Sequence, residues 1–314
     1  MTSRVLVTGR IPLSVVRMLE TVCAVEMYEG DDPISHAELV ARVSGLHGLV
    51  SLITEQVDSE VIAAGRDLKV IANVGVGYNN IDVGSARARG IVVTNTPDVL
   101  TEATADFTWA LILGVTRRLG EGERLVRRGG WKRWALDFML GTELRGKQLG
   151  IVGHGRIGQA VAVRGRAFGM RIAYATRTRQ DAPDAEPMAL GRLLATSDVV
   201  SLHVPLTPET THLIDQAALA RMKRGAYLIN TTRGSVVDEA ALVWALNQHL
   251  IAGAGLDVYE REPEMHPGLL AFENVVLAPH LGSATIETRT AMADLAARNV
   301  IAVLSDEPPL NPIQ

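Results

Sequence analysis

Arg233, Glu262 and His280 each follow a short apolar run, and together they have the side chains needed to reduce a keto acid. The planar guanidinium of arginine can bind a carboxylate with two hydrogen bonds and polarise a neighbouring carbonyl. Histidine ionises near neutral pH and can donate a proton to an oxygen that gains charge. A carboxylate beside the imidazole would orient the ring and stabilise its charged form. Singly, these residues would be surface charges or loop residues, and only the set predicts the chemistry.

The apolar runs before these residues belong to a series of strands in the second part of the chain. Strand and helix patterns alternate there, which predicts a parallel sheet with helices on both faces. The carboxyl ends of parallel strands lie at one edge, where ligands bind. We therefore expect Arg233, Glu262 and His280 to meet in one crevice. The six predicted strands are Gln148–Val152, Arg171–Ala175, Val199–His203, Ala226–Asn230, Ala254–Val258 and Val275–Ala278.

The first third of the chain shows the same alternation and predicts a smaller doubly wound domain. Ser35 and Glu38 have the spacing of a capping box, which predicts a helix that begins after Ser35. The five predicted strands are Val5–Thr8, Ala24–Tyr28, Leu49–Ile53, Val70–Val74 and Ile91–Thr94.

Four further segments have recognisable patterns. Apolar residues at helical spacing predict a long helix over Glu102–Arg118, bridging the two domains, and a C-terminal helix over Ile286–Leu304. Gly129–Trp134 is predicted to be a loop that carries two tryptophans. The proline-rich and acidic segment Asp181–Pro187 is predicted to be a surface loop.

Gly153, Gly155 and Gly158 fit the G-x-G-x-x-G pattern of a dinucleotide-binding loop. The pattern follows a buried type of strand and opens a predicted helix, which is the context that such a site requires. The first glycine permits a tight turn, the second lets the backbone approach a pyrophosphate, and the third allows close packing of helix on strand. The helix N-terminus favours the anion. The alternative is a plain strand-to-helix turn with incidental glycines.

The residues after the next strand bear on the choice between NADPH and NADH. A site that prefers NAD usually has an acidic residue there to hold the ribose 2′-hydroxyl. Ala175 takes that place here, and Thr176, Arg177 and Arg179 follow before the first acidic residue, Asp181. Guanidinium groups suit a phosphate dianion, so NADPH is expected over NADH. NADH remains the alternative, in which both arginines are ordinary exposed charges.

Composition excludes several other classes of protein. The 314 residues are enough for two domains, and the net charge of -4 gives no basic surface for nucleic acid or membrane. Cys23 is the only cysteine, so no intrachain disulfide can form and a reducing compartment is expected. No apolar stretch approaches the roughly 18 residues of a membrane helix, and the N-terminus turns polar too soon for a signal peptide. The sequence therefore predicts a cytoplasmic protein, and it predicts no metal site.

Across nearly its whole length, the sequence resembles the D-isomer-specific 2-hydroxyacid dehydrogenase family, particularly the glyoxylate/hydroxypyruvate reductase branch. The matching segments occur in the order found in the family and are together highly specific. They are Asn73–Asp82, Gly153–Gly158, Asp198–Thr207, Asn230–Gly234, Gly255–Val258 and Pro279–Ala284.

The resemblance implies a flavodoxin-like substrate domain over 1–98 and 286–314, a Rossmann dinucleotide-binding domain over 99–285, and an active-site cleft between them. It implies that Arg233 binds substrate, that Glu262 supports His280 and that His280 is the acid/base. The backbone of Val76 and Gly77 should hold the substrate carboxylate, and Leu52 and Leu100 should line the pocket. A homodimer is expected, in which Trp134 either reaches the partner's active site or serves as an interface anchor.

The resemblance also implies the residues that contact the cofactor, with Asp257 at the nicotinamide amide and Thr104 nearby. The full set is Thr104, Gly153, Gly155, Arg156, Ile157, Gly158, Thr176, Arg177, Thr178, His203, Val204, Pro205, Thr210, Thr231, Thr232, Arg233, Asp257, His280 and Gly282.

We expect NADPH-dependent reduction of glyoxylate or hydroxypyruvate to glycolate or D-glycerate. 2-Ketogluconate and phenylpyruvate remain open, since one or two methylenes alter discrimination by only about 1 to 3 kcal/mol. A phosphoglycerate dehydrogenase-like activity is less favoured, because the chain ends at Gln314 without the extra C-terminal regulatory domain of many such enzymes. Two alternatives remain. The protein could oxidise formate or phosphite, or it could be a dinucleotide-sensing corepressor whose function is to bind a partner protein.

Overall fold

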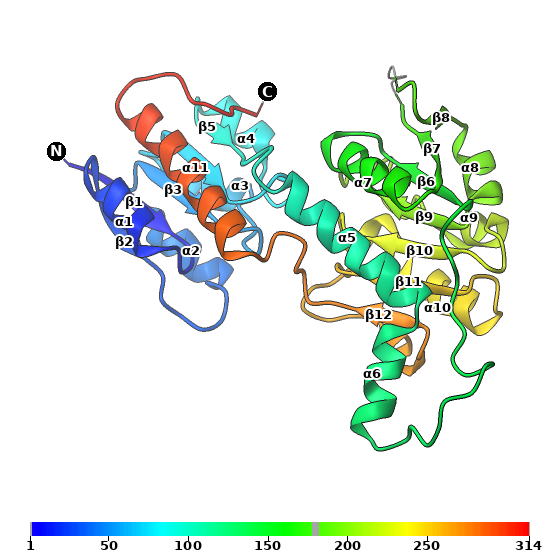
Figure 1. Ribbon diagram of the computed structural model, residues 1–314. Coiled ribbons are helices and arrows are strands. Elements are labelled where there is room, and N and C mark those ends of the chain that lie inside the picture. Colours follow the sequence, from blue (N-terminus) through cyan, green and yellow to red (C-terminus); the bar gives the residue numbers. More distant parts are fainter. Residues whose placement is uncertain (1, 178–181, 314) are drawn as a thin grey trace. The chain divides into compact units, whose positions relative to one another are not determined.

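Two parallel sheets form the framework of the chain, one in each of two units (Figure 1). The computed structural model describes residues 2–177 and 182–313. Unit 1 comprises Met1–Leu100 and Thr285–Gln314, and unit 2 comprises Thr101–Ala284. The predicted α/β fold with two doubly wound parallel sheets is confirmed.

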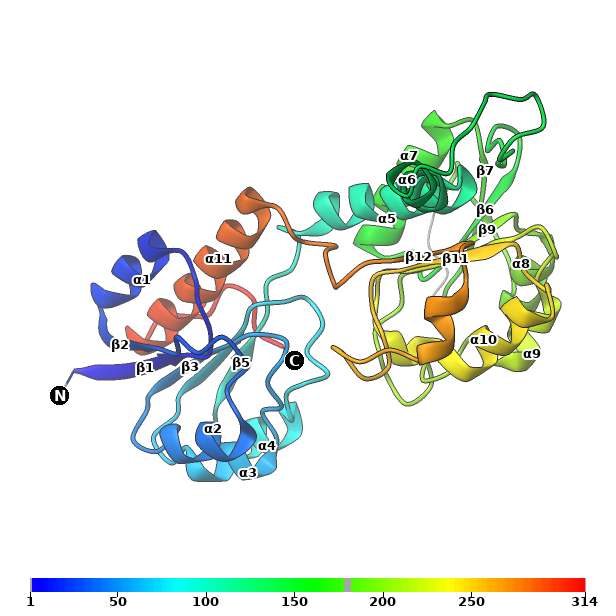
Figure 2. The same cartoon turned by 90° about the horizontal axis from the view of Figure 1, so that it is seen from below.

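Unit 1 has the strand order β2-β1-β3-β4-β5, which is the flavodoxin-like order. Its strands are β1 (Ser3–Val7), β2 (Cys23–Met27), β3 (Gly48–Ser51), β4 (Val70–Asn73) and β5 (Val92–Thr94). Its helices are α1 (Leu13–Glu20), α2 (His36–Arg42), α3 (Ser59–Ala64), α4 (Val83–Ala88) and α11 (Ile286–Leu304). Figure 2 shows α1 and α11 on one face of the sheet and α2, α3 and α4 on the other.

Alternate residues of the unit 1 strands are buried on opposite faces of the sheet. Leu6 and Leu49 belong to one hydrophobic cluster, whereas Val5 and Val50 belong to the other. This burial on both faces is why the strands read as continuous apolar runs. Helix ends follow the sequence signals: the Ser35 hydroxyl accepts the N–H of Glu38 at 3.3 Å, as the capping-box spacing predicted.

Unit 2 has the strand order β12-β11-β10-β9-β6-β7-β8, the order of a dinucleotide-binding sheet with an added edge strand. Its strands are β6 (Gln148–Val152), β7 (Arg171–Ala175), β8 (Glu186–Pro187), β9 (Val199–Leu202), β10 (Tyr227–Asn230), β11 (Gly253–Leu256) and β12 (Val275–Leu277). Its helices are α5 (Thr101–Thr116), α6 (Leu119–Arg127), α7 (Arg156–Ala167), α8 (Leu190–Thr196), α9 (Gln216–Arg221) and α10 (Glu239–Asn247), with 3-10 turns η1 (Gly234–Val236) and η2 (Pro267–Ala271).

Helices α5 and α7 pack on one face of this sheet, and α8, α9 and α10 lie on the other (Figure 2). The prediction of a loop over Asp181–Pro187 is wrong for its last two residues, because Glu186–Pro187 pairs with β7 as the short edge strand β8. A two-residue edge strand is too short to show any hydrophobic period, which explains why it could not be expected from the sequence.

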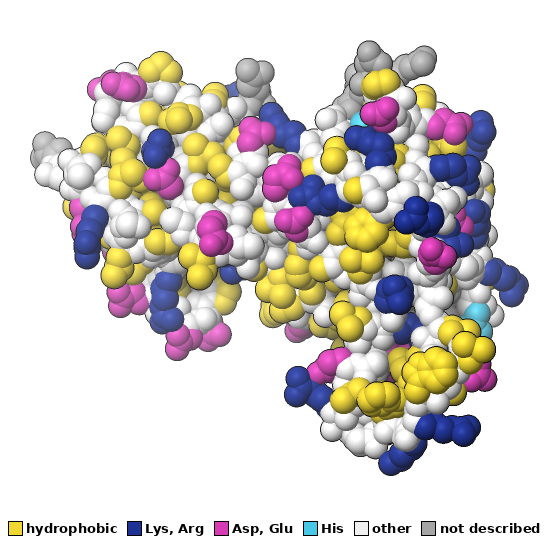
Figure 3. All heavy atoms as spheres, viewed as in Figure 1, with side chains coloured by type: hydrophobic (Ala, Val, Ile, Leu, Met, Phe, Trp, Pro, Cys, Tyr) yellow, Lys and Arg dark blue, Asp and Glu magenta, His cyan; other side chains and the backbone are white. Residues whose placement is uncertain are grey.

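The expected long helix over Glu102–Arg118 is present as α5, which is unbroken over Thr101–Thr116, ends two residues before the expected end and belongs to unit 2. Arg118 adopts a left-handed conformation with φ of 53°, and α6 begins at the next residue. No glycine or proline marks this break. Around α6 and the loop that follows it, hydrophobic side chains gather on the surface (Figure 3), including Leu119, Val126, Trp131, Trp134, Leu136 and Leu140.

None of the helices in the described residues 2–177 and 182–313 is long and apolar enough to cross a membrane.

Candidate active site

Arg233 lies in the loop that leaves the carboxyl end of β10, and Asn230 shapes that loop. The Asn230 side-chain amide donates to the Arg233 carbonyl at 3.0 Å, while its Oδ1 accepts the N–H and the hydroxyl of Thr232 at 3.0 and 2.8 Å. The Arg233 side chain is half-buried, and burial lowers the pKa of its guanidinium while the charge of Glu262 raises it. The loop thus holds a partly desolvated cation near a carboxylate.

Gly234 allows the Arg233 loop to approach the backbone that follows β11. A Cβ atom on Gly234 would lie 1.7 Å from the carbonyl carbon of Tyr259, so no other residue fits without movement of the backbone. Glu239 and Glu260 join the same two segments, since each carboxylate accepts the backbone N–H of the other residue at 2.7 and 2.8 Å. These contacts fix the start of the loop that carries Glu262.

Glu262 and His280 form a hydrogen-bonded pair, with 2.7 Å between Glu262 Oε2 and His280 Nδ1. The Tyr259 N–H donates to Glu262 Oε1 at 3.1 Å. Burial opposes ionisation of Glu262, but the His280 hydrogen bond and the charges of His280 and Arg233 outweigh it, so the pKa of Glu262 lies below its ordinary value. The carboxylate is therefore charged at neutral pH and can stabilise an imidazolium.

Asp257 holds the loop that carries His280. Its two carboxylate oxygens accept the backbone N–H groups of Leu281 and Gly282 at 2.6 and 2.8 Å, and its carbonyl accepts the N–H of His280 at 2.9 Å. Burial raises the pKa of Asp257, although these two N–H bonds act in the opposite direction. Asp257 was expected at the nicotinamide amide, and in the structure it holds the His280 loop.

Several other expected cofactor residues gather at this edge of unit 2. A Cβ on Gly282 would lie 3.5 Å from Thr104 Cγ2, which places α5 beside the His280 loop. The hydroxyls of Thr108 and Thr231 are 3.0 Å apart, so the same helix also contacts the segment before Arg233.

The glycine loop between β6 and α7 has the geometry that a dinucleotide needs. Gly153 has φ of +92°, and a Cβ there would lie 2.4 Å from the His203 carbonyl oxygen. A Cβ on Gly158 would lie 2.3 Å from the Gly153 carbonyl oxygen, whereas one on Gly155 would meet nothing within 4 Å. The first and third glycines are therefore required for packing, and the second leaves open space before the first turn of α7, which begins with Arg156 and Ile157. These residues fit a nicotinamide dinucleotide.

The segment after β9 borders the glycine loop. His203 Nε2 lies 2.8 Å from the Ser201 hydroxyl, and burial lowers the pKa of His203 to about 3, with the charge of His154 adding to the effect. Burial therefore favours the neutral form of this imidazole. Val204 contacts the Gly153 turn, and the Thr210 hydroxyl donates to the Pro205 carbonyl at 2.7 Å, which closes the segment into a compact loop.

Thr176 and Arg177 are exposed at the carboxyl end of β7, next to the glycine loop in the sheet order. A hydrogen bond from Thr207 lowers the pKa of Glu209, and the charge of Arg177 contributes to that shift. The charge of Arg177 therefore acts on the loop after β9. Thr178, Arg179 and Asp181 lie outside the described residues.

The expected substrate residues of unit 1 lie in loops at the carboxyl ends of its strands. Leu52 follows β3, and Val76 and Gly77 follow β4, while Leu100 is buried at the end of the unit. Trp134 belongs to unit 2 and is 74% exposed on the loop after α6.

The sequence assigned no role to Asn230, Gly234, Tyr259, Glu239 and Glu260, although Asn230 and Gly234 bound one matching segment and Glu260 is a second carboxylate two positions before Glu262. The glycine that directly follows Arg233 was a usable signal, because a glycine beside a functional residue often permits close backbone approach. The Glu239–Glu260 pair had no signal, since it joins positions 21 residues apart. In the part of the chain that the structure describes, no group of three or more His, Cys, Asp or Glu residues could hold a metal ion.

Comparison with known proteins agrees with this geometry. A model of the D-isomer specific 2-hydroxyacid dehydrogenase NAD-binding domain matches residues 109–282. Glyoxylate reductase of Thermococcus onnurineus (strain NA1) is 48% identical over 317 residues, covering 98% of this chain and 95% of that protein. Glyoxylate reductase of Thermofilum pendens (strain DSM 2475 / Hrk 5) is 50% identical over 315 residues, covering 98% and 93%.

Solved structures of similar fold and sequence agree with these relatives. The TT0316 protein of Thermus thermophilus has a TM-score of 0.94 at 48% identity, covering 99% of this chain and 100% of that chain. An NADPH-dependent glyoxylate/hydroxypyruvate reductase of Sinorhizobium meliloti, solved with NADP and malonate, has a TM-score of 0.90 at 38% identity, covering 100% and 97%. The chain therefore belongs to the D-isomer specific 2-hydroxyacid dehydrogenase family, and it is an NAD(P)-dependent oxidoreductase that acts on the 2-keto and 2-hydroxy forms of an acid.

Proposed function

We propose that the protein reduces glyoxylate or hydroxypyruvate to glycolate or D-glycerate with NADPH. The observation that carries this proposal is the 2.7 Å pair of Glu262 and His280, in the same unit as the partly desolvated Arg233 and the glycine loop. The names of the relatives support the small substrate, and the Sinorhizobium meliloti reductase solved with NADP supports NADPH as cofactor.

The chain's own residues would carry out binding and proton transfer. When bound, the reduced nicotinamide supplies the hydride that C2 of the keto acid gains. Arg233 would bind the carboxylate and polarise the keto oxygen. His280 would donate its proton to that oxygen from Nε2, because Nδ1 faces Glu262. The Glu262 carboxylate would stabilise the imidazolium before the transfer and keep the ring oriented.

In unit 1, the backbone of Val76 and Gly77 would bind the substrate carboxylate, and Leu52 and Leu100 would line the pocket. In unit 2, Thr176 and Arg177 would bind the 2′-phosphate of NADPH, since the place of the usual acidic residue is taken by Ala175.

Steady-state kinetics with a panel of acids tests the proposal. The purified protein is assayed with glyoxylate, hydroxypyruvate, 2-ketogluconate, phenylpyruvate and phosphohydroxypyruvate, each with NADPH and NADH, and with formate and phosphite in the oxidative direction. The highest kcat/KM should occur with glyoxylate or hydroxypyruvate and NADPH, and hydroxypyruvate should yield the D-acid. A higher kcat/KM with any other substrate, or with NADH, would show that the proposed substrate or cofactor is wrong. A stable complex with another protein and no turnover would favour the corepressor alternative.

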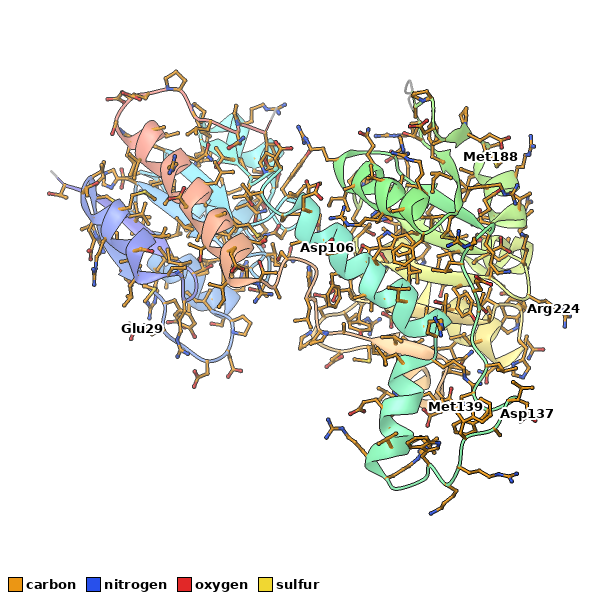
Figure 4. All side chains as sticks on the ribbon, in the orientation of Figure 1. Glu29, Asp106, Asp137, Met139, Met188 and Arg224 are labelled. Carbon is orange, nitrogen blue, oxygen red and sulfur yellow. The ribbon has the colours of Figure 1, made fainter. Side chains whose placement is uncertain are left out.

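We further propose that the protein is a homodimer joined through α6 and the loop that follows it. Figure 3 shows hydrophobic side chains gathered there, and Leu136 is 82% exposed. Figure 4 shows Asp137 and Met139 on the same loop. Exposed apolar patches of this kind mark interaction sites.

Light scattering after size exclusion should give twice the mass of one chain for the wild type. A Trp134→Ser, Leu136→Ser double variant should give the mass of one chain. A monomeric wild type would refute the dimer. A Trp134→Ala variant that stays dimeric but has a higher KM would indicate that Trp134 reaches the partner's active site.

A further inference from the structure

Two asparagine side chains hold all three carbonyl groups of the loop Gly75–Gly77 in unit 1. The Asn73 amide donates to the carbonyls of Gly75 and Gly77 at 3.2 and 2.9 Å. The Asn95 amide donates to the Val76 carbonyl at 2.8 Å. Three successive carbonyls are thus bound by side chains that come from the ends of β4 and β5, and the Gly75 carbonyl also accepts the backbone N–H of Thr96 at 3.0 Å.

This arrangement determines the direction of the neighbouring N–H groups. In a planar trans peptide, the N–H points opposite to the carbonyl of the preceding residue. The N–H groups of Val76, Gly77 and Tyr78 therefore point away from the two asparagines. Successive N–H groups that face the same way form a concave site for an anion.

Asn73 is itself held in one orientation. Its side chain is fully buried, and its Oδ1 lies 3.5 Å from the Asn80 amide. The Asn80 amide also donates to the carbonyls of Leu52 and Glu55, at 3.3 and 3.1 Å. Because Asn80 faces Oδ1, the donor end of Asn73 is directed at the loop. A flipped amide would place oxygen against two carbonyls.

The same polar cluster fixes the loop after β3. The Thr8 hydroxyl accepts the Leu52 N–H at 3.0 Å and donates to the buried Glu55 carboxylate at 2.5 Å. With Asn80 on its carbonyl, Leu52 has both of its backbone polar groups bound by side chains. The two loops at this edge of the sheet thus form one hydrogen-bonded assembly.

We propose that Asn73 and Asn95 are positioning residues that preorganise the Gly75–Gly77 loop as the carboxylate site for the keto acid. This inference rests on the proposed function, because it takes the keto acid to be the anion that the loop binds. Neither asparagine touches the substrate. Each acts by turning the loop carbonyls away and so presenting N–H groups to the carboxylate before substrate arrives.

Four variants test the inference: Asn73→Leu, Asn73→Asp, Asn95→Ala and Asn274→Leu. Asn73→Leu removes the donors at nearly constant size, and Asn73→Asp replaces the donor with a charged acceptor. Asn95→Ala removes the donor to Val76 at a less buried position, in case the Asn73 variants fail to fold. Asn274→Leu is the matched control, because its amide donates to the Ala252 carbonyl at 2.8 Å at the amino end of β12. Each variant is assayed for glyoxylate reduction, oxalate binding, NADPH binding and thermal unfolding.

All three variants at Asn73 and Asn95 should raise the KM for glyoxylate and the Kd for oxalate by about tenfold or more, the usual effect of losing a buried hydrogen bond. At saturating glyoxylate, kcat should stay within about twofold of the wild type, as should the Kd for NADPH. Asn274→Leu should change none of these quantities.

Three results would overturn the inference: an unchanged KM, a fall in kcat and thermal stability with no change in KM, or an effect confined to Asn73→Asp, which charge repulsion alone would explain. A wild type that reduces no keto acid would refute the proposed function instead. The oxalate measurement would then still decide whether Asn73 and Asn95 maintain an anion site.

Discussion

Gly234 lies against the backbone of Tyr259 so closely that a Cβ atom on Gly234 would be 1.7 Å from the Tyr259 carbonyl carbon. This contact brings the loop of Arg233 next to the segment that leads to Glu262. The candidate site therefore depends on a position that has no reactive group.

Gly234→Ala should separate these two loops. The added methyl group overlaps the backbone, so we expect a loss of about 1–3 kcal/mol in the free energy of unfolding and a fall in kcat/KM of at least about tenfold. Urea unfolding and steady-state kinetics measure the two effects. Gly225→Ala is the control, because a Cβ there meets nothing within 4 Å. A Gly234→Ala protein with the stability and kcat/KM of the wild type would show that the loops tolerate separation.

Glu262→Gln should lower kcat by about 10² to 10⁴-fold, since the amide cannot stabilise an imidazolium as a carboxylate does. The pH dependence follows from the lowered pKa of Glu262. A carboxylate with a lowered pKa is charged above that pKa and loses its effect only as pH falls through it. Glu262 should therefore stay charged from neutral pH down to the ordinary glutamate pKa of 4.5, and protonation of Glu262 should cause no loss of wild-type kcat/KM in this range. A loss of wild-type kcat/KM with an apparent pKa above 4.5 that is absent from Glu262→Gln would contradict the pairing.

Asp257→Asn should disturb His280 without removing it. One of the two N–H groups after His280 would then face an amide donor in place of a carboxylate oxygen. We expect a loss of about 1–3 kcal/mol in unfolding free energy, and a fall in kcat that exceeds any rise in the KM for the keto acid. Asp215→Ala is a control that removes the cap of α9 and should cost about 1 kcal/mol without altering kcat. An Asp257→Asn enzyme with unchanged kcat would leave Asp257 with a purely structural role.

Arg177→Ala tests the site of the 2′-phosphate. Loss of a charged hydrogen-bond donor should weaken NADPH binding by about ten- to a hundredfold and leave NADH binding unchanged. Isothermal titration with both dinucleotides measures this. Arg224→Ala is the matched control, because Arg224 is an exposed arginine that precedes the amino end of β10, whereas Arg177 follows the carboxyl end of β7 (Figure 4). Equal loss of NADPH and NADH affinity would rule out a specific role at the 2′-phosphate.

Much of the fold could be predicted from apolar period and turn residues. β6, β7 and α11 begin and end at the predicted residues, because their buried runs are bounded by clear polar or glycine signals. β8 and the break at Arg118 could not be predicted. β8 has only two residues, and Arg118 takes a left-handed conformation that its residue type does not announce.

The candidate site, like the fold, could be predicted only in part. Arg233, Glu262 and His280 could be selected from their positions after successive strands. The contacts that hold them could not, because Asn230, Gly234 and Tyr259 act through backbone proximity that no spacing rule encodes. Asp257 could be selected as a site residue, but its bonds to Leu281 and Gly282 depend on the path of a loop.

The most direct test of the account compares the wild type with His280→Ala in single-turnover reduction of glyoxylate by enzyme-bound NADPH. We predict oxidation of NADPH by the wild type and, with both proteins saturated with NADPH, a rate at least about 10²-fold lower in the variant. A wild type that oxidises no NADPH with any keto acid, or a His280→Ala protein as fast as the wild type, would contradict it.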